Sequence, residues 1–227
     1  MASAETTSVP SSSARASPTR LLPDAVGPNT AITSQASGLL ATGAPYIEVP
    51  RQNEGMGLEI RRLDAEDARA HLDGLARVLA DCVAGGASVS FMAPFSHDDA
   101  RSVFEGVAAD LERGRRVLLA AFADGELVGT VQVLLALPPN QPHRGEIVKL
   151  LVHSSARRRG VAQRLMEHAE IEARAEGRSL LVLDAVTGGD AERLYARIGW
   201  NKVGVIPGYA LFPDGRPCDT TYFWKSI

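Results

Sequence analysis

The hydrophobic pattern of the folded part of the chain opens with a strand followed by two helices. Apolar and polar residues alternate from Leu58 to Leu63, which predicts a strand. Asp64 stands where a helix would be capped, and apolar residues then recur at helical spacing from Leu72 to Cys82. A second helix is expected from about Ser96 to about Gly114, because its apolar residues are spaced four apart.

A hairpin is predicted directly after these helices. Residues 117–123 have the pattern of a strand, Asp124 and Gly125 form a tight turn, and residues 127–137 return as the second strand. A proline-rich loop at residues 138–143 separates this hairpin from the next strand.

Strands and helices alternate in the remainder of the chain. The expected elements are a strand at 146–152, a helix from 161 that ends at Gly177, a strand at 180–184, a short helix at 191–198, a strand at 200–206, a loop at 207–217 and a strand at 220–225. This order predicts an α+β fold, a sheet with helices on both faces, and it lacks the regular alternation of a Rossmann fold.

The N-terminal segment differs in composition from the rest. Residues 1–57 are dominated by Ala, Ser, Thr, Pro and Gly, so they cannot bury enough apolar surface to fold, and we expect a disordered tail. Arg15 and Arg20 within a serine-rich stretch leave an organellar transit peptide as the alternative. The folded domain is expected to span residues 58–227.

Composition narrows the classes of function. A net charge of −3 and a pI near 6.0 give no support to nucleic-acid binding. The two cysteines, Cys82 and Cys218, lack the spacing of metal ligands, and the five histidines are dispersed, so we expect no metal site and treat the histidines as incidental. No apolar run is long enough to span a membrane, which favours a cytoplasmic protein.

One segment has the pattern of a phosphate-binding turn. Residues 157–162 read Arg-Arg-Arg-Gly-Val-Ala and join an apolar strand to an amphipathic helix. Backbone N–H groups at a helix start have no partners within the helix and lie at the positive end of its dipole, which suits a pyrophosphate. Small residues allow close approach, and arginines add charged hydrogen bonds. The alternative is a solvated basic turn.

Together with the strand before it, this segment resembles the acetyl-CoA motif of the GCN5-related N-acetyltransferase (GNAT) superfamily. Ser154 and Ala162 replace the proline and glycine common in that motif. The resemblance implies a mixed, mostly antiparallel sheet of about six to seven strands flanked by about four helices. It also implies that the pantetheine arm pairs with the backbone of Leu151 and Val152, and that the pyrophosphate lies on Arg157, Arg158, Arg159, Gly160, Val161 and Ala162.

A second resemblance lies at residues 191–200, which are similar to the Ala-x-x-Leu-Tyr-x-x-x-Gly-Phe segment of the same superfamily. It implies that Tyr195 protonates the departing thiolate, a role for which a phenol with a pKa near 10 is suited. The alternative is a core tyrosine. Where many relatives carry an asparagine a few residues earlier, this chain has Thr187 to Asp190, which puts that contact to the pantetheine in doubt.

Two strand-end carboxylates are candidates for the general base. Glu146 begins one predicted strand and Asp184 ends the next, so the two would face a common cleft if these strands are adjacent and splayed. An amine acceptor needs such a group, because at neutral pH it is mostly protonated. The alternative is that both carboxylates are solvated or paired with Lys149.

Residues 207–216 and 221–225, together with residues 146–150 and 183–184, resemble the tabtoxin-resistance type of GNAT acetyltransferase. This resemblance implies that the acceptor is the primary amine of a small amino-acid-like molecule. The expected function is therefore acetyl transfer from acetyl-CoA within a ternary complex, by a monomer or homodimer. Two alternatives remain: acetylation of a protein or peptide amine, favoured by an open groove, and a non-catalytic acyl-CoA-binding module.

Overall fold

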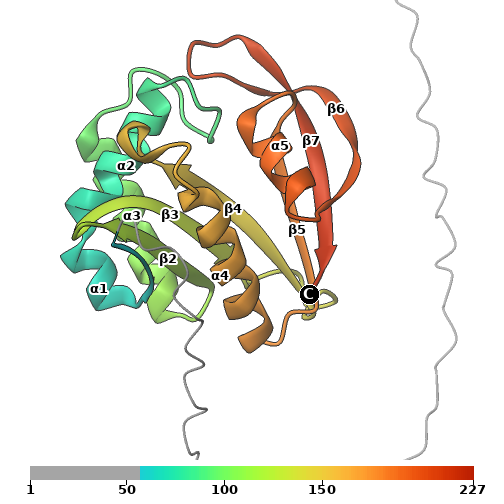
Figure 1. The fold of residues 1–227 in the computed structure, drawn as a ribbon, viewed down its shortest axis with the longest axis horizontal. Coiled ribbons are helices and arrows are strands. Elements are labelled where there is room, and N and C mark those ends of the chain that lie inside the picture. Colours follow the sequence, from blue (N-terminus) through green and yellow to red (C-terminus); the bar gives the residue numbers. More distant parts are fainter. Residues whose placement is uncertain (1–56) are drawn as a thin grey trace, which may run out of the picture. The chain divides into compact units, whose positions relative to one another are not determined.

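The computed structural model describes residues 57–227 (Figure 1). The expectation of a disordered tail concerns residues outside this described part. Its elements in chain order are β1 (Leu58–Leu63), α1 (Ala65–Ala70), α2 (Leu72–Ala84), α3 (His97–Glu112), β2 (Arg116–Ala123), β3 (Glu126–Leu134), β4 (Arg144–Val152), a 3-10 turn (Ser154–Ala156), α4 (Val161–Ala175), β5 (Leu180–Val186), α5 (Asp190–Arg197), β6 (Asn201–Leu211) and β7 (Pro217–Ser226).

These strands form one seven-stranded sheet in the order β1-β2-β3-β4-β5-β7-β6. All neighbouring strands are antiparallel except β4 and β5, which are parallel. The predicted α+β fold with a mixed, mostly antiparallel sheet is confirmed.

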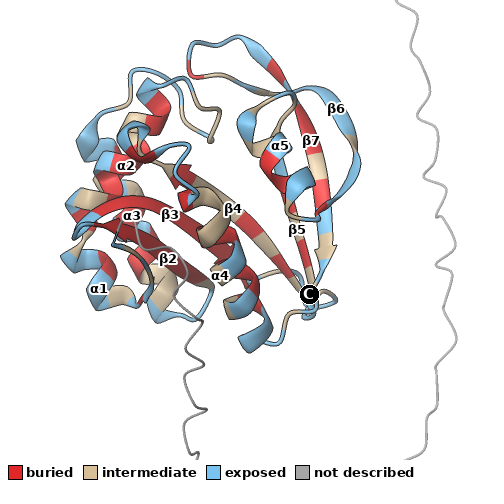
Figure 2. Ribbon diagram, viewed as in Figure 1, coloured by how far each residue is buried: buried red, intermediate tan, exposed pale blue. Residues whose placement is uncertain are grey.

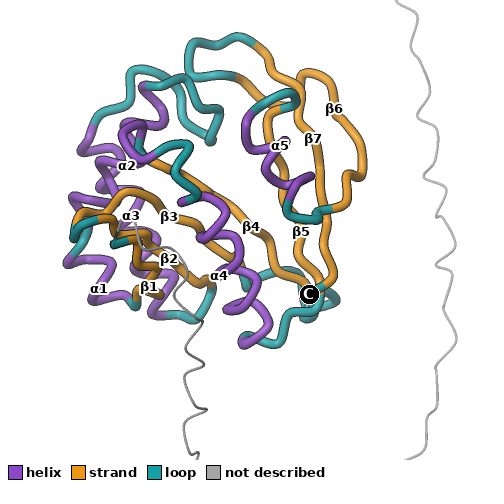
Figure 3. The backbone as a smooth tube through the Cα atoms, viewed as in Figure 1, coloured by secondary structure: helices purple, strands orange, loops and turns teal. Residues whose placement is uncertain are grey.

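The sheet buries a separate apolar cluster on each face. On one face α4 and α5 cover side chains such as Val131, Ile147 and Leu183, while on the other α1, α2 and α3 cover side chains such as Leu118 and Phe122. The view of the backbone in Figure 3 shows α4 lying along β3 and β4. Figure 2 shows the central strands β2 and β3 as the most continuously buried part of the sheet.

The predicted helix starts have the expected chemistry. Asp64 accepts a hydrogen bond from the N–H of Asp67 at 2.8 Å and so caps α1. Ser96 and Asp99 form a reciprocal capping box at the start of α3. Both helix starts are therefore fixed by local sequence.

Two local predictions were wrong. The single helix expected after Asp64 is two helices that meet at His71, whose ring packs edge-on against Phe122 with the ring centres 5.0 Å apart. Strand β6 does not end at Ile206 but continues to Leu211. A bulge between Ile206 and Ala210 takes up Pro207 and Gly208, which would otherwise interrupt the pairing with β7.

Candidate active site

Strand β4 changes its partners along its length, and this opens the sheet. It pairs with β5 only from Arg144 to Glu146, after which the two strands diverge (Figure 1). Gly145 allows the two strands to approach closely where they pair, since a Cβ atom at this position would lie 2.8 Å from Leu181 Cδ2. Among the described residues, no strand pairs with the β5-facing edge of β4 beyond Glu146. That edge includes Leu151 and Val152.

A bulge lies at the middle of this open stretch. The register between β3 and β4 shifts between Thr130 and Gln132, and Lys149 has a positive φ of 54°. Non-glycine residues seldom adopt this conformation. After the bulge, Leu151 belongs to the core under α1, α2 and α3, whereas Ile147 before it belongs to the core under α4 and α5.

The start of α4 lies just beyond the open edge. Gly160 precedes the helix in the left-handed conformation with φ 79°, and no side chain caps the helix. The N–H groups of its first turn therefore lack a side-chain partner. Arg158 and Arg159 are exposed beside this turn, Val161 is buried and Ala162 is half-buried. An uncapped helix start with two exposed arginines fits a pyrophosphate.

Close packing sets the position of α4. A side chain at Gly129 in β3 would begin 3.0 Å from the carbonyl oxygen of Leu151 and 3.2 Å from both Leu165 and Val161. Because Gly129 has no side chain, the first turns of α4 lie directly against β3 and β4.

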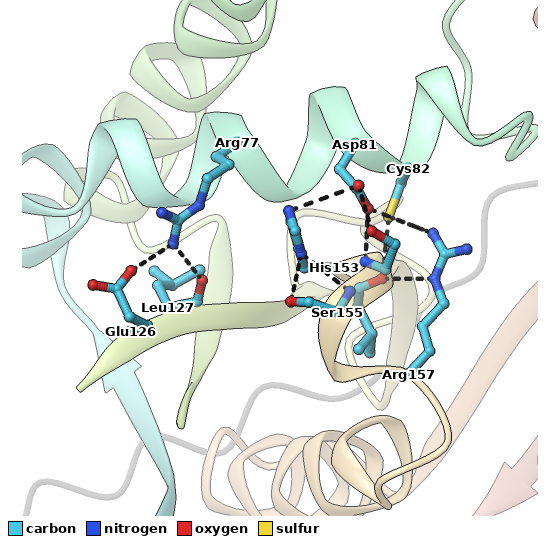
Figure 4. Close-up of polar contacts among 10 residues, drawn as sticks. Arg77, Asp81, Cys82, Glu126, Leu127, His153, Ser155 and Arg157 are labelled. Atoms are coloured by element: carbon cyan, nitrogen blue, oxygen red, sulfur yellow. Dashed lines mark hydrogen bonds and ion pairs between the residues drawn. The ribbon is translucent and has the colours of Figure 1, made fainter. Parts of the chain in front are cut away.

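Arg157 differs from its two neighbours, because its guanidinium contacts the protein. Its Nε donates to the carbonyl oxygen of Val152 at 3.1 Å, and its Nη2 lies 3.7 Å from the carboxylate of Asp81 in α2. Figure 4 shows Asp81 and Cys82 projecting from α2 towards this turn. The side chain of Arg157 therefore braces the turn after β4.

Asp81 is a residue that sequence reasoning missed. Its carboxylate accepts hydrogen bonds from the backbone N–H and the hydroxyl of Ser154, at 2.8 and 2.7 Å. Burial opposes its ionisation, but the bonds from Ser154 and the nearby His153 and Arg157 outweigh burial and lower the pKa of Asp81. The available signal was a carboxylate in the last turn of a helix, where the dipole disfavours it.

His153 also belongs to this network, although the dispersed histidines were expected to be incidental. Its Nδ1 lies 2.8 Å from the hydroxyl of Ser155, and its Nε2 lies 3.6 Å from Asp81 (Figure 4). Its backbone N–H donates to Val128 of β3. The turn between β4 and α4 is thus fixed to α2 and to β3.

Tyr195 lies in α5 with its ring in the core. It is 4 % exposed, with its ring centre 6.0 Å from that of Trp200 and 5.7 Å from that of Phe223. Among the described residues, its hydroxyl has no hydrogen-bond partner. Burial, and to a smaller extent the charge of Asp184, raise the pKa of Tyr195 far above its ordinary value. The phenol therefore stays protonated and keeps its hydrogen available as a donor.

Glu146 and Asp184 lie on the same face of the sheet. Their neighbours Ile147 and Leu183 point into the core under α4 and α5, so both carboxylates point to the other face. Asp184 is exposed, yet protein surrounds enough of it that burial raises its pKa. The charge of Glu146 adds to this effect and Lys149 opposes it. The two carboxylates are therefore close enough to interact.

Neither carboxylate is hydrogen-bonded to Lys149, while the exposure of Asp184 agrees with the alternative of a solvated carboxylate. Glu146 pairs with Arg144 at 3.3 Å. The ammonium of Lys149 hydrogen-bonds to neither carboxylate but donates to Val89 and Ser90.

A cavity of about 430 Å³ includes Asp184 in its wall. It lies between the loop of residues 85–96, the end of β5 and the hairpin of β6 and β7, and is lined by Ser88, Ser90, Phe91, Met92, Asp184, Ala185, Val186, Tyr209, Ala210, Leu211 and Thr220. A separate cavity of about 500 Å³ lies against α1 and α3 and contains neither Glu146, Asp184 nor Tyr195.

Comparison with protein-family models shows the family to which the chain belongs. The acetyltransferase (GNAT) family matches residues 81–200, which is more than half of the chain. The chain belongs to the GNAT family of acetyltransferases. The match contains the open edge of β4, the start of α4, Asp184 and Tyr195, so the features described above belong to the family's shared region.

Solved structures of acetyltransferases share the GNAT fold with this chain. An N-acetyltransferase from Staphylococcus aureus Mu50 superposes with a TM-score of 0.63 at 20 % identity, over 75 % of this chain and 98 % of its own. A ribosomal-protein-alanine N-acetyltransferase from Brucella melitensis gives 0.63 at 21 %, over 74 % and 99 %. The yncA acetyltransferase from Salmonella typhimurium, solved with its cofactor acetyl-CoA, gives 0.62 at 19 %, over 74 % and 93 %.

The family uses acetyl-CoA, and the uncapped start of α4 and the open edge of β4 fit that donor. Residues 57–227 contain no group of three or more His, Cys, Asp or Glu side chains arranged to hold a metal ion. Each helix in this part of the chain is too short or too polar to cross a membrane.

Proposed function

We propose that this GNAT acetyltransferase transfers an acetyl group from acetyl-CoA directly to the primary amine of a small molecule, within a ternary complex. The observation that carries the proposal is the cavity of about 430 Å³ with Asp184 in its wall. Its volume lies within the range that accommodates a small molecule. The β5 residues in its wall, Asp184, Ala185 and Val186, follow the stretch of β5 that pairs with β4.

The donor would be held by the two features that lie beyond this divergence. The β5-facing edge of β4 at Leu151 and Val152, which pairs with no strand in the described part of the chain, would receive the pantetheine arm as an added strand, with the carbonyl oxygen of Val152 already bonded to Arg157. The N–H groups at the start of α4, with Gly160 and the exposed Arg158 and Arg159, receive the pyrophosphate. Arg157 contributes mainly by bracing this turn. When bound, acetyl-CoA supplies a thioester whose carbonyl carbon accepts the amine.

Asp184 and Glu146 prepare the acceptor amine. An ammonium group in the cavity would face the carboxylate of Asp184, and it must lose a proton before its nitrogen becomes nucleophilic. Burial and the charge of Glu146 raise the pKa of Asp184, which makes it a better proton acceptor than an ordinary aspartate. Asp184 is therefore the base that receives the proton, directly or through water, and Glu146 supports it.

Tyr195 completes the reaction. Its hydroxyl remains protonated and is unpaired among the described residues, so it can give a proton to the sulfur that departs. The packing of its ring against Trp200 and Phe223 fixes the direction in which the hydroxyl points.

Two observations support a small amine as the acceptor. Asp184 provides one negative charge among apolar and hydroxyl side chains, which fits a small amine. The resemblance of residues 207–216 and 221–225 to the tabtoxin-resistance type favours an amino-acid-like amine within this class.

A thiol-release assay tests the proposal. Purified protein is incubated with acetyl-CoA and a panel of amino acids, amino-sugars, polyamines and short peptides. Release of CoA that depends on a small amine supports the proposal. Release only with peptides would replace it by peptide acetylation, and binding of acetyl-CoA without turnover on any acceptor would indicate a non-catalytic module.

A further inference from the structure

Lys149 connects the bulge of β4 to the loop of residues 85–96, which we name the acceptor loop. Its Nζ donates to the carbonyl oxygen of Val89 at 2.7 Å and to the hydroxyl of Ser90 at 2.9 Å. The same ammonium lies 5.2 Å from the centre of the Phe91 ring. Three consecutive residues of the loop therefore contact one side chain.

Both ends of this connection have unusual backbone conformations. Lys149 has φ 54° and Ser90 has φ 78°, in a region that side-chain-bearing residues seldom occupy. Such conformations persist only where surrounding contacts hold them. The bulge aims the Lys149 side chain at the loop, and the loop turns its carbonyl and hydroxyl groups towards that side chain.

The acceptor loop forms one wall of the cavity that contains Asp184. Ser88, Ser90, Phe91 and Met92 all line it. On its far side the loop is held by the hairpin of β6 and β7, where the hydroxyl of Ser88 donates to Leu211 at 2.7 Å. The N–H of Ala93 likewise donates to Pro213 at 2.9 Å. Lys149 is the tether to β4.

The hydrogen bonds of Lys149 to the acceptor loop are made by a partly enclosed charge. Burial lowers the pKa of Lys149, because removing the ammonium from water costs free energy. Both of its hydrogen-bond partners, the carbonyl of Val89 and the hydroxyl of Ser90, are neutral. An apolar side chain would avoid that cost, but it could not donate a hydrogen bond to Val89 or Ser90. The charge of Asp184 acts against burial and favours the charged form of Lys149.

We propose that Lys149 is a positioning residue that fixes the acceptor loop to the bulge of β4 and thereby sets the shape of the acceptor cavity. The inference rests on the proposed function, because it assigns this cavity to the acceptor. The bulge lies on β4, whose unpaired edge is the proposed binding site of the pantetheine arm. The side chain of Lys149 therefore connects the strand that would bind acetyl-CoA to the loop that lines the acceptor cavity.

Two variants and one control test this role. Lys149→Met removes the charge and both hydrogen bonds while keeping the length of the side chain. Ser90→Ala removes one of the two bonds and leaves the charge. Lys202→Met makes the same replacement at a half-exposed lysine of β6 paired with Glu192, where little effect is expected. Each is compared with the wild type by hydrogen exchange of residues 86–93 and by steady-state kinetics.

The predicted result is graded. Lys149→Met speeds exchange in the acceptor loop and raises the KM for the acceptor about tenfold, with the KM for acetyl-CoA within about twofold of wild type. For Ser90→Ala, the exchange rate of the loop and the KM for the acceptor lie between those of Lys149→Met and the wild type. Lys202→Met gives wild-type values of both. Unchanged loop exchange and acceptor KM in Lys149→Met would overturn the proposal, as would an equal rise in both KM values.

The two readouts separate this proposal from the proposed function. If the wild type acetylated no acceptor, the proposed function would fail, while the exchange data would still show whether Lys149 holds the loop. If Lys149→Met did not fold, as judged by thermal unfolding, Ser90→Ala would decide: faster loop exchange supports the tether, and unchanged exchange contradicts it.

Discussion

The carboxylate of Asp81 accepts two hydrogen bonds from Ser154, one from its backbone N–H at 2.8 Å and one from its hydroxyl at 2.7 Å. This contact ties the end of α2 to the turn that leads into α4. Because the start of α4 is the proposed pyrophosphate site, we expect Asp81, 73 positions before Ser154 in the sequence, to influence the geometry of the donor site.

Replacement of Asp81 by alanine should weaken donor binding and destabilise the fold. Ser154 would lose both bonds to Asp81, and because water can reach these exposed groups, we expect a loss of about 0.5–1.5 kcal/mol of unfolding free energy. The affinity for acetyl-CoA should fall about tenfold, since each tenfold corresponds to about 1.4 kcal/mol. Isothermal titration calorimetry and urea unfolding measure both quantities.

Ser154→Ala is the matched control for Asp81, because it removes only the hydroxyl bond and should give a smaller loss. The pH dependence adds a second check. The folded-state pKa of Asp81 is lowered from the ordinary 3.8, so its contribution is present above that value and is lost as the pH falls through the folded pKa. A stability difference from wild type that did not narrow below about pH 4 would contradict this account.

Asp184→Asn should abolish most activity while making the protein more stable at neutral pH. The folded-state pKa of Asp184 is raised above 3.8 by burial first and by Glu146 second. A raised carboxylate pKa means that the ionised form opposes folding at pH 7, and that this penalty disappears as the pH falls below the unfolded value. We expect kcat/KM for the acceptor to fall at least about 100-fold. Thermal unfolding at pH 7 and pH 4 measures the stability, and a lower melting temperature at pH 7 would oppose this assignment.

Tyr195→Phe should lower kcat and leave folding intact. The ring contacts with Trp200 and Phe223 remain in the variant, and no hydrogen bond among the described residues is lost. Loss of a general acid lowers kcat about 100-fold or more. The KM for acetyl-CoA should stay within about twofold, as expected when only a transition-state contact is removed. A variant with wild-type kcat would show that Tyr195 is only a core residue.

Gly129→Ala tests whether close packing of α4 positions the donor site. The new methyl group would lie 3.0 Å from the carbonyl oxygen of Leu151 and 3.2 Å from Val161, so β4 or the first turns of α4 must shift slightly to admit it. Such overpacking costs about 1–3 kcal/mol, and we expect weaker acetyl-CoA binding as well. Gly106→Ala in α3, where no atom lies within 4 Å of the new methyl group, should be neutral or stabilising. Equal effects of both variants would refute the packing argument.

Local sequence was sufficient for most of the fold. The period of apolar residues located the strands, and capping residues such as Asp64 and Ser96 fixed helix starts because their bonds reach only three residues along the chain. The break at His71 and the extension of β6 beyond Ile206 were missed. Both depend on tertiary partners, the ring of Phe122 and the strand β7.

The candidate site was partly predictable for the same reason. The turn at residues 157–162 is local, and the register of β4 and β5 brings Glu146 and Asp184 to one face. Asp81, His153 and the contacts of Lys149 are made across long sequence separations, so no periodicity reveals them. Arg157 illustrates the limit: its position in the motif was evident, but its contacts with Asp81 and Val152 were not.

The most direct test of the central claim is mass spectrometry of an acceptor amine after incubation with acetyl-CoA and the protein. The account predicts a singly acetylated amine with wild-type protein, little product with Asp184→Asn or Tyr195→Phe, and no acetyl group left on the protein itself, because transfer is direct. Equal product with all three proteins, or an acetylated protein that forms and then decays as product appears, would contradict it.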